Sequence, residues 1–359
     1  MAQPLSGLTI LDFSTLLPGP LATLMLAEAG ARVVKVERPG GEDMRRFPPF
    51  LDGRSAIHAM LNRGKETVFL DLKSEAGRER ALALACEADV LVEQFRPGVM
   101  ARLGLGYDAV GRMNPRIVYC SITGYGQTGP RAGEAGHDVN YIGNTGLLAQ
   151  SWGTADQPVL PPTQIADIGG GTFPAVINIL LALLARQRTG TGLHLDIAMS
   201  DAMFTFAVMA HVFAGLTGEA PANGAGLLTG GSPRYGLYPA RCGTPICVGA
   251  LEEPFWMAFC DAVGVPPDRR NDGQEPAAVR SAVAEAVRSR SADEWRPILA
   301  AANCCATVLE PLEAALGDPH FIERGLVEGR PPDGSPAVPE AVLPIAPAFR
   351  AGKRGGGTA

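Results

Sequence analysis

The sequence predicts an α/β protein: a large domain built on a doubly wound, mainly parallel sheet of the Rossmann-like kind, and a smaller α+β domain. Short β-rich runs alternate with helical patterns through the first half of the chain, which is typical of βαβ units. The chain has 359 residues, 46% of them apolar, which is enough to form two cores. A glycine- and proline-rich stretch at 218–234 separates this half from a run of short strands and amphipathic helices.

The elements of the first half follow from the spacing of apolar residues. Because crossovers between parallel strands are right-handed, the strands predict a sheet with helices on both faces. A strongly apolar helix follows the glycines at 169–171, and a strand beginning near 194 leads into a further helix. We expect strands at 8–13, 32–37, 66–72, 89–95 and 116–122, and helices at 20–30, 75–88, 140–149 and 173–185.

The predicted small domain follows the stretch at 218–234, which we interpret as a linker. Its amphipathic patterns alternate with short β-rich runs, as in α+β folds. We expect strands at 235–240 and 245–250, and helices at 254–263, 277–289 and 292–302.

Composition excludes several classes of protein. The net charge is −6 and the basic residues are scattered along the chain, which argues against nucleic acid as a partner. The N-terminus lacks the pattern of a signal peptide, and the apolar run at 173–185 is too short to cross a bilayer, so we expect a cytoplasmic protein without a membrane partner. The seven cysteines show no CxxC spacing, so we predict reduced thiols and no metal site.

Common catalytic motifs are missing from the sequence. There is no GxSxG, HExxH or P-loop lysine motif, which leaves serine hydrolase, zincin and P-loop interpretations without support. The first turn from strand to helix, STLLPGP, lacks the GxGxxG of dinucleotide enzymes. Any chemistry must therefore come from acids and bases in glycine-rich turns.

Three such residues are candidates, and each also has a structural interpretation. His137 stands before a helical pattern, where it could transfer a proton or simply pack against the turn. Asp167 precedes three glycines and an apolar helix, where it could act as an acid or cap the helix. Glu252 follows a strand, where it could charge a histidine or only favour the helix dipole.

Basic residues recur at the ends of the predicted strands or in the loops beside them. Open α/β sheets bind ligands at this edge, so several cations there indicate a nucleotide-like anion. These residues are Arg38, Arg63, Lys65, Lys73 and Arg96.

Together these stretches resemble the class III CoA-transferase family. The resemblance runs from about Leu5 to Arg350, and the motifs LDLKS, QFRPG, GHD and ADIGGGT carry it. It implies an interlocked homodimer, in which the chain leaves the large domain, forms the small one and returns. The domains implied are 1–217 for the large domain, 218–234 for the linker, 235–320 for the small domain and 321–359 for the return and tail.

The resemblance also implies the site. Transferases of the family use the aspartate at the position of Asp167 as a nucleophile, whereas its racemases add a histidine at the position of His137. It pairs Glu252 with that histidine. The CoA contacts that it implies are Arg38, Leu70, Asp71, Leu72, Lys73, Gln94, Phe95, Arg96, Arg102, Gly136, Asp138, Val139, Asn140 and Tyr141.

The histidine favours a racemase that inverts the α-carbon of 2-methylacyl-CoA thioesters by two-base proton transfer. No separate cofactor is expected, because CoA enters as part of the substrate. Two alternatives stay open: a transferase that moves CoA between acids through an acyl group on Asp167, and a CoA-binding protein without turnover.

Overall fold

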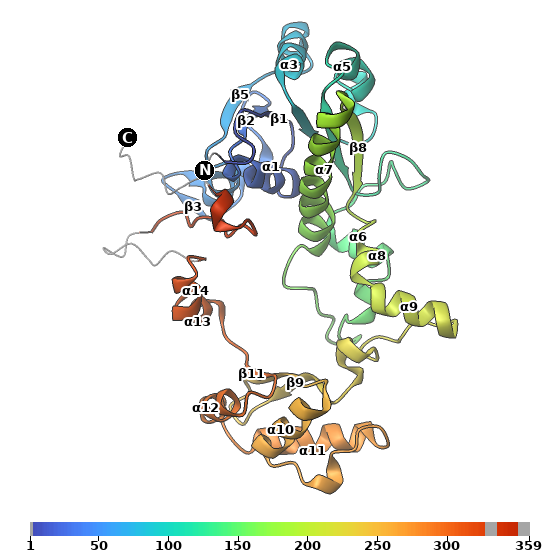
Figure 1. The fold of residues 1–359 in the computed structure, drawn as a ribbon, viewed down its shortest axis with the longest axis vertical. Helices are drawn as coiled ribbons and strands as arrows, with labels where there is room; N and C mark the ends of the chain where they lie inside the picture. The colour runs from blue at the N-terminus through green and yellow to red at the C-terminus, as the bar shows by residue number, and fades with distance from the viewer. Residues whose placement is uncertain (1–2, 327–335, 351–359) are drawn as a thin grey trace. The chain divides into compact units, whose positions relative to one another are not determined.

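The computed structural model describes residues 3–326 and 336–350, and the chain divides into two compact units (Figure 1). The first unit comprises the described residues within Met1–Thr145, Pro161–Phe206 and Gly325–Ala359. The second comprises Gly146–Leu160 and Ala207–Arg324. The domain limits drawn from the sequence stay a prediction, and part of the predicted return at 321–359 lies outside the described residues.

A six-stranded parallel sheet forms the centre of the first unit, as the βαβ pattern predicts. Its strand order is β5-β2-β1-β6-β7-β8, so the chain adds strands on both sides of β1. The strands are β1 (Thr9–Asp12), β2 (Arg32–Glu37), β5 (Glu66–Phe69), β6 (Val90–Glu93), β7 (Val118–Thr123) and β8 (Leu193–Ala198).

Two groups of helices pack on this sheet, which confirms the predicted α/β class. Helices α1 (Pro18–Glu28) and α7 (Phe173–Thr189) contact each other and the strands beneath them. Helices α3 (Glu75–Glu87) and α5 (Tyr107–Met113) also pack together, and share a core with Leu11 and Leu91 of the sheet. The other elements of this unit are β3 (Phe50–Leu51), β4 (Arg54–Ser55), α2 (Ala56–Leu61), α4 (Val99–Arg102), α6 (Asp138–Asn144) and α8 (Met203–Phe206).

Charged side chains are buried beside the first turn from strand to helix. The Lys35 ammonium lies 2.9 Å from the Glu42 carboxylate and donates to the Ser14 carbonyl, with both charged side chains inaccessible to solvent. Lys65 Nζ lies 3.2 Å from the equally buried Asp12. Burial by itself raises the pKa of Asp12, but the two lysines and nearby hydroxyls lower it overall. The network therefore fixes the turn that enters α1.

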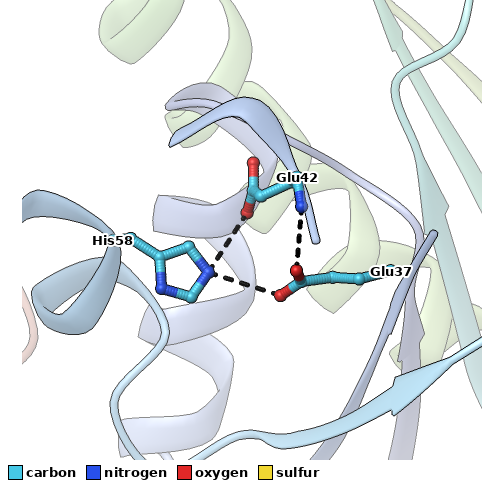
Figure 2. A group of neighbouring side chains, drawn as sticks. All are labelled: Glu37, Glu42 and His58. Atoms are coloured by element: carbon cyan, nitrogen blue, oxygen red, sulfur yellow. Dashed lines mark hydrogen bonds and ion pairs between the residues drawn. The ribbon is translucent and has the colours of Figure 1, made fainter. Parts of the chain in front are cut away.

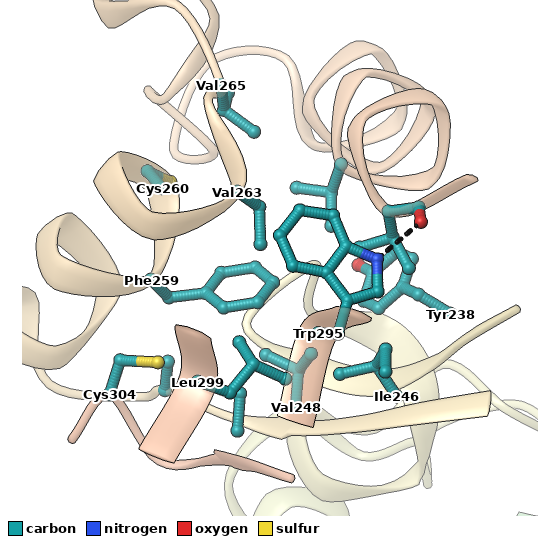
Figure 3. Packing of buried hydrophobic residues seen from close by; sticks show 14 of the residues in the cluster. Tyr238, Ile246, Val248, Phe259, Cys260, Val263, Val265, Trp295, Leu299 and Cys304 are labelled. Carbon is teal, nitrogen blue, oxygen red and sulfur yellow. Dashed lines mark hydrogen bonds between the residues drawn. The ribbon is translucent and has the colours of Figure 1, made fainter. Parts of the chain in front are cut away.

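The second unit has its own core, around a three-stranded antiparallel sheet in the order β11-β10-β9. Trp256 and Trp295 are fully buried. Trp295 Nε1 donates to the Val287 carbonyl at 2.8 Å (Figure 3). The elements are α9 (Val208–Thr217), β9 (Tyr235–Pro239), β10 (Pro245–Gly249), α10 (Glu253–Val263), α11 (Pro276–Arg288), α12 (Ala292–Ala302), β11 (Ala306–Val308), α13 (Leu312–Leu316) and α14 (Pro319–Glu323).

Two helices end at least four residues away from their predicted carboxyl ends, whereas the other predicted helix ends agree to within two residues. The helix expected at 140–149 is α6, which begins at Asp138 and ends at Asn144 because Thr145 and Gly146 close it. The helix expected at 173–185 continues a π-helical segment, Ala166–Thr172, and the whole stretch Ala166–Thr189 is long and apolar enough, by length and composition alone, to cross a membrane. Ile179 and Ala182 of α7 are buried within the unit. A cytoplasmic location stays a prediction.

The burial of the Lys35–Glu42 pair predicts a large loss of stability when the lysine charge is removed. Lys35→Met leaves the Glu42 carboxylate buried without its cation, so we expect a loss of about 3–5 kcal/mol in the free energy of unfolding. Arg32→Met on the same strand is the control, because the Arg32–Glu66 pair is exposed to solvent and should contribute less than about 1 kcal/mol. Urea unfolding followed by circular dichroism measures both; equal losses would contradict this interpretation of the network.

Candidate active site

His137 lies directly before α6, in a turn that hydrogen bonds to itself. Its backbone N–H donates to Asn140 Oδ1 at 3.0 Å, and the Tyr141 hydroxyl donates to the Gly136 carbonyl at 2.5 Å. The imidazole is exposed, whereas Tyr141 is buried. The turn is thus held by its neighbours while the imidazole stays accessible, an arrangement that suits proton transfer better than packing.

Asp167 belongs to the π-helical segment Ala166–Thr172 that leads into α7. This segment packs closely on neighbouring backbone: a Cβ at Gly170 would lie 2.2 Å from the Met199 carbonyl oxygen, so only glycine fits there. Thr172 Oγ1 donates to the Pro18 carbonyl at 2.8 Å, which ties the segment to the first residue of α1. The Asp167 side chain is half-buried.

The Asp138 carboxylate joins these two segments. Its Oδ1 accepts the backbone N–H groups of Ala166 at 2.6 Å and of Asp167 at 3.0 Å. Asp138 therefore satisfies free amides at the start of the segment that carries Asp167, the role of a cap. The sequence offered capping as the structural interpretation of Asp167, but Asp138 performs it and leaves the Asp167 carboxylate available.

The surroundings raise the pKa of Asp167 to about 6. Burial is the largest cause, the negative charge of Asp138 adds to it, and the nearby imidazole of His137 acts in the opposite direction. A carboxyl group with this pKa exchanges its proton near neutral pH, which ordinary aspartates do not. The effect of His137 on the pKa of Asp167 shows that the two side chains lie near each other.

The predicted CoA contacts gather at one edge of the sheet. Arg38 follows β2, Leu70–Lys73 follow β5 and Gln94–Arg96 follow β6, and these strands are near neighbours in the parallel sheet. Their carboxyl ends therefore face the same side, where open α/β sheets bind ligands. Arg102, at the end of α4, is exposed.

Three of the basic residues predicted to meet a polyphosphate already have partners. Arg38 pairs with Asp43, and its Nε donates to the Gly41 carbonyl at 2.9 Å. Lys65 is buried: its Nζ donates to Thr23 Oγ1 and the Pro20 carbonyl, and burial lowers the pKa of Lys65 to about 8. The prediction for Lys65 is wrong, because its ammonium balances Asp12. Arg63 pairs with Glu28 and Glu340.

Glu252 and Glu253 belong to the second unit. Glu252 is exposed and lies just before α10, whereas Glu253 pairs with Arg234 at 2.7 Å. Of the two carboxylates, Glu252 is therefore the one without that ion pair. Its pairing with His137 stays a prediction.

A further titratable cluster, which the sequence did not single out, consists of Glu37, Glu42 and His58 (Figure 2). The ligand atoms lie within 4.8 Å of one another, which is close enough for a metal ion. However, the Arg45 guanidinium binds Glu37 at 2.6 Å, and the Lys35 ammonium lies 2.9 Å from Glu42. Because resident cations already balance both carboxylates, the cluster is better explained as part of the buried ion network.

The fold and the site together define a class. A parallel sheet with cations at its carboxyl edge, beside a histidine and an aspartate with a raised pKa, is typical of enzymes that bind a nucleotide-bearing substrate and move protons or acyl groups. Comparison with known proteins then gives the family. The chain belongs to CoA-transferase family III, which it matches over residues 5–350.

Relatives of the chain include both CoA-transferases and racemases. The chain is 33% identical to an acetyl-CoA:oxalate CoA-transferase of Acetobacter aceti, over 87% of this chain and 82% of the relative. It is 32% identical to the alpha-methylacyl-CoA racemase of Homo sapiens, over 96% of this chain and 89% of the relative. A crystal structure of a CAIB/BAIF family protein from Brucella suis is similar with a TM-score of 0.82 and 29% identity, covering 96% of this chain and 93% of that one.

The negative charge of Asp138 next to Asp167 predicts how the activity of an Asp138 variant depends on pH. Asp138→Asn keeps an oxygen that accepts both amides but removes the negative charge, so the pKa of Asp167 should fall from about 6 toward its ordinary value. An acidic limb in the pH profile of kcat/KM that reports Asp167 should move to lower pH.

The profile of Asp138→Asn is compared with that of Glu134→Gln, which removes an exposed carboxylate from the same loop. An acidic limb that stays in place in Asp138→Asn, or moves equally in both variants, would contradict the assigned role of Asp138.

Proposed function

We propose that this chain is a racemase or epimerase that inverts the α-carbon of 2-methylacyl-CoA thioesters by two-base proton transfer. The observation that carries the proposal is the pair of proton-transfer groups, His137 and Asp167, on two segments that Asp138 joins. Inversion requires one group to remove the α-proton from one face of the carbon while another returns a proton to the opposite face. A transferase needs only the aspartate.

The pKa of about 6 suits Asp167 to this task. In one direction ionised Asp167 removes the proton and protonated His137 returns one, and in the other direction the roles reverse. Both groups need pKa values near the working pH, because each must be found in both protonation states during turnover. Histidine is the residue type whose ordinary pKa lies nearest to neutral pH, and burial raises the pKa of Asp167 toward the same range.

The thioester carbonyl takes the negative charge when the α-proton leaves. The backbone N–H groups of Asp138 and Val139 make no hydrogen bond to another group in the described part of the chain, and they begin α6 beside His137. They are therefore the donors we assign to the enolate oxygen, whose developing charge such amides stabilise. With these donors the reaction requires no separate cofactor.

CoA enters as part of the substrate at the carboxyl edge of the sheet. Arg38 and Arg102 are assigned to phosphate groups, and the loops at 70–73, 94–96 and 136–141 to the rest of the CoA moiety. The pairing of Glu252 with His137 that the resemblance implies stays part of the proposal. These assignments rest on the resemblance and on the position of the loops.

A second candidate is a CoA-transferase with Asp167 as the nucleophile. The identity to the acetyl-CoA:oxalate CoA-transferase favours it, since that relative is as similar to the chain as the racemase is. In that reaction the Asp167 carboxylate attacks the thioester carbonyl and displaces the CoA thiolate, which leaves an acyl anhydride on Asp167. The thiolate then attacks the aspartyl carbonyl and releases the first acid. The second acid attacks the aspartyl thioester and displaces the thiolate again, and the thiolate finally attacks the carbonyl of that acid, which frees Asp167. A CoA-binding protein without turnover is the third candidate, and it would show neither reaction.

The two faces of the carbon can be told apart by isotope. In deuterated water, His137→Ala should retain exchange at the α-carbon of one enantiomer, and Asp167→Asn should retain it for the other, because each variant keeps one base. Racemisation should fall at least about 100-fold in both, as general acid–base catalysis contributes about that much or more. Mass spectrometry and chiral chromatography measure exchange and inversion.

His320→Ala, which removes a histidine far along the chain in the second unit, is the control and should change neither rate. Full racemisation by His137→Ala, together with an acyl group trapped on Asp167 by hydroxylamine, would overturn the racemase proposal in favour of the transferase.

We also propose that two copies of the chain form a homodimer. One side of α7 packs within the first unit, whereas Ile177, Leu181 and Leu184 on its other side are more than half exposed. An apolar face of this kind marks an interaction surface. A second copy is the occupant that the resemblance implies.

Light scattering should therefore give a mass twice the 37.5 kDa of one chain. Leu181→Glu should shift the protein toward monomer, because it places a charge on the apolar face of α7. Met113→Glu on α5, at a residue of similar exposure (56% against 58%), is the control and should leave the mass unchanged. A stable monomer that is fully active would contradict the dimer.

A further inference from the structure

A cavity of about 430 Å³ lies in the first unit, separate from the pair His137 and Asp167. Its floor is formed by three adjacent strands: Glu93 ends β6, Ser121 lies within β7, and His194 lies near the start of β8. The first turn of α5, which includes Tyr107, lies at its side. Its volume is within the range of pockets that hold small organic molecules.

The floor of the cavity carries polar groups that the proposed reaction does not use. Ser121 Oγ lies 2.9 Å from His194 Nε2, and the Glu93 carboxylate accepts the Phe95 N–H at 2.8 Å. The ring of Tyr107 stacks on the imidazole of His194, with centroids 5.2 Å apart and an angle of 18° between the planes. These contacts hold the polar groups in fixed positions, as a binding site requires.

The remaining polar groups of the lining are mainly donors. Gln127 Nε2 is buried and has no hydrogen-bond partner in the described part of the chain, although buried donors are nearly always paired. Arg96 and Arg112 add two guanidinium groups to the lining, opposed by the single exposed carboxylate of Asp108. A bound acceptor with a negative charge would satisfy the unpaired amide and balance the cations.

We propose that this cavity binds a small organic carboxylate. A carboxylate matches the planar donor fork of an arginine and accepts from an amide at the same time. A phosphate dianion fits less well, because Asp108 and Glu93 would repel its second charge. Burial raises the pKa of Glu93 to about 7, so near neutral pH this wall of the cavity carries less than a full negative charge.

The site has a consequence for the proposed enzyme through Arg96. This residue lines the cavity and also belongs to the loop assigned to CoA. A carboxylate that engages Arg96 should therefore weaken the binding of a CoA thioester, and the thioester should weaken the binding of the acid by the same factor. This consequence rests on the proposed function, whereas the carboxylate site does not.

The test is isothermal titration of the whole chain with propionate and with phenylacetate. We expect binding of at least one acid, about tenfold weakened by Arg112→Ala, which corresponds to the loss of one charged hydrogen bond. Gln127→Leu should weaken it similarly, and Ala109→Phe, which fills the cavity from α5, should abolish it. Arg80→Ala on α3, outside the lining, is the matched control and should leave the affinity unchanged. Circular dichroism verifies that each variant is folded.

Three results would overturn the proposal. The first is that neither acid binds at millimolar concentration. The second is binding that Asp167→Asn abolishes and Arg112→Ala leaves intact, which would place the acid in the candidate active site. The third is binding of inorganic phosphate, with the same response to the variants, in place of either carboxylate. Deuterium exchange by the wild-type chain is measured separately, so failure of this site and failure of the proposed function are distinguishable.

Discussion

The site depends on one carboxylate, Asp138, which accepts two backbone amides from the segment that carries Asp167. His137 is its neighbour in sequence, so the same contact helps to fix the positions of both residues that we propose as proton-transfer groups. The charge of Asp138 also helps burial to raise the pKa of Asp167. Asp138 therefore affects both the position of Asp167 and its pKa. A change that breaks these hydrogen bonds should also change the pKa of Asp167.

A network of buried ion pairs lies beside the turn that enters α1. Lys35 and Lys65 balance Glu42 and Asp12 below the turn that enters α1, and Glu42 accepts the N–H of Leu16 within that turn at 2.8 Å. Leu16 has a φ of 62°, a conformation that costs energy for a side chain other than glycine. Directly after this turn, the carbonyl of Pro18 at the start of α1 accepts the hydroxyl of Thr172. The ion network therefore stabilises the turn next to which the segment with Asp167 is bonded.

The parallel sheet and the edge that holds the predicted CoA contacts could be predicted from the sequence, because apolar periodicity and strand ends are local properties. The burial of Lys65 could not be predicted, since its partner Asp12 lies on β1, 53 positions earlier in the sequence, and only the folded sheet brings the two together. The link from Asp138 to Asp167 was likewise hidden, because it joins residues 29 positions apart through backbone amides. The sequence indicated His137 and Asp167 as candidate bases, and the structure showed that burial and Asp138 raise the pKa of Asp167.

The central claim is that the chain moves a proton at the α-carbon and not an acyl group. The most direct test is a wild-type reaction in deuterated water, begun with a single enantiomer of a 2-methylacyl-CoA and sampled at early times. Two separate bases predict deuterium at the α-carbon of the inverted product, with far less in the unreacted enantiomer. Inversion without deuterium, or transfer of CoA to an added acid while the α-proton is kept, would contradict the account.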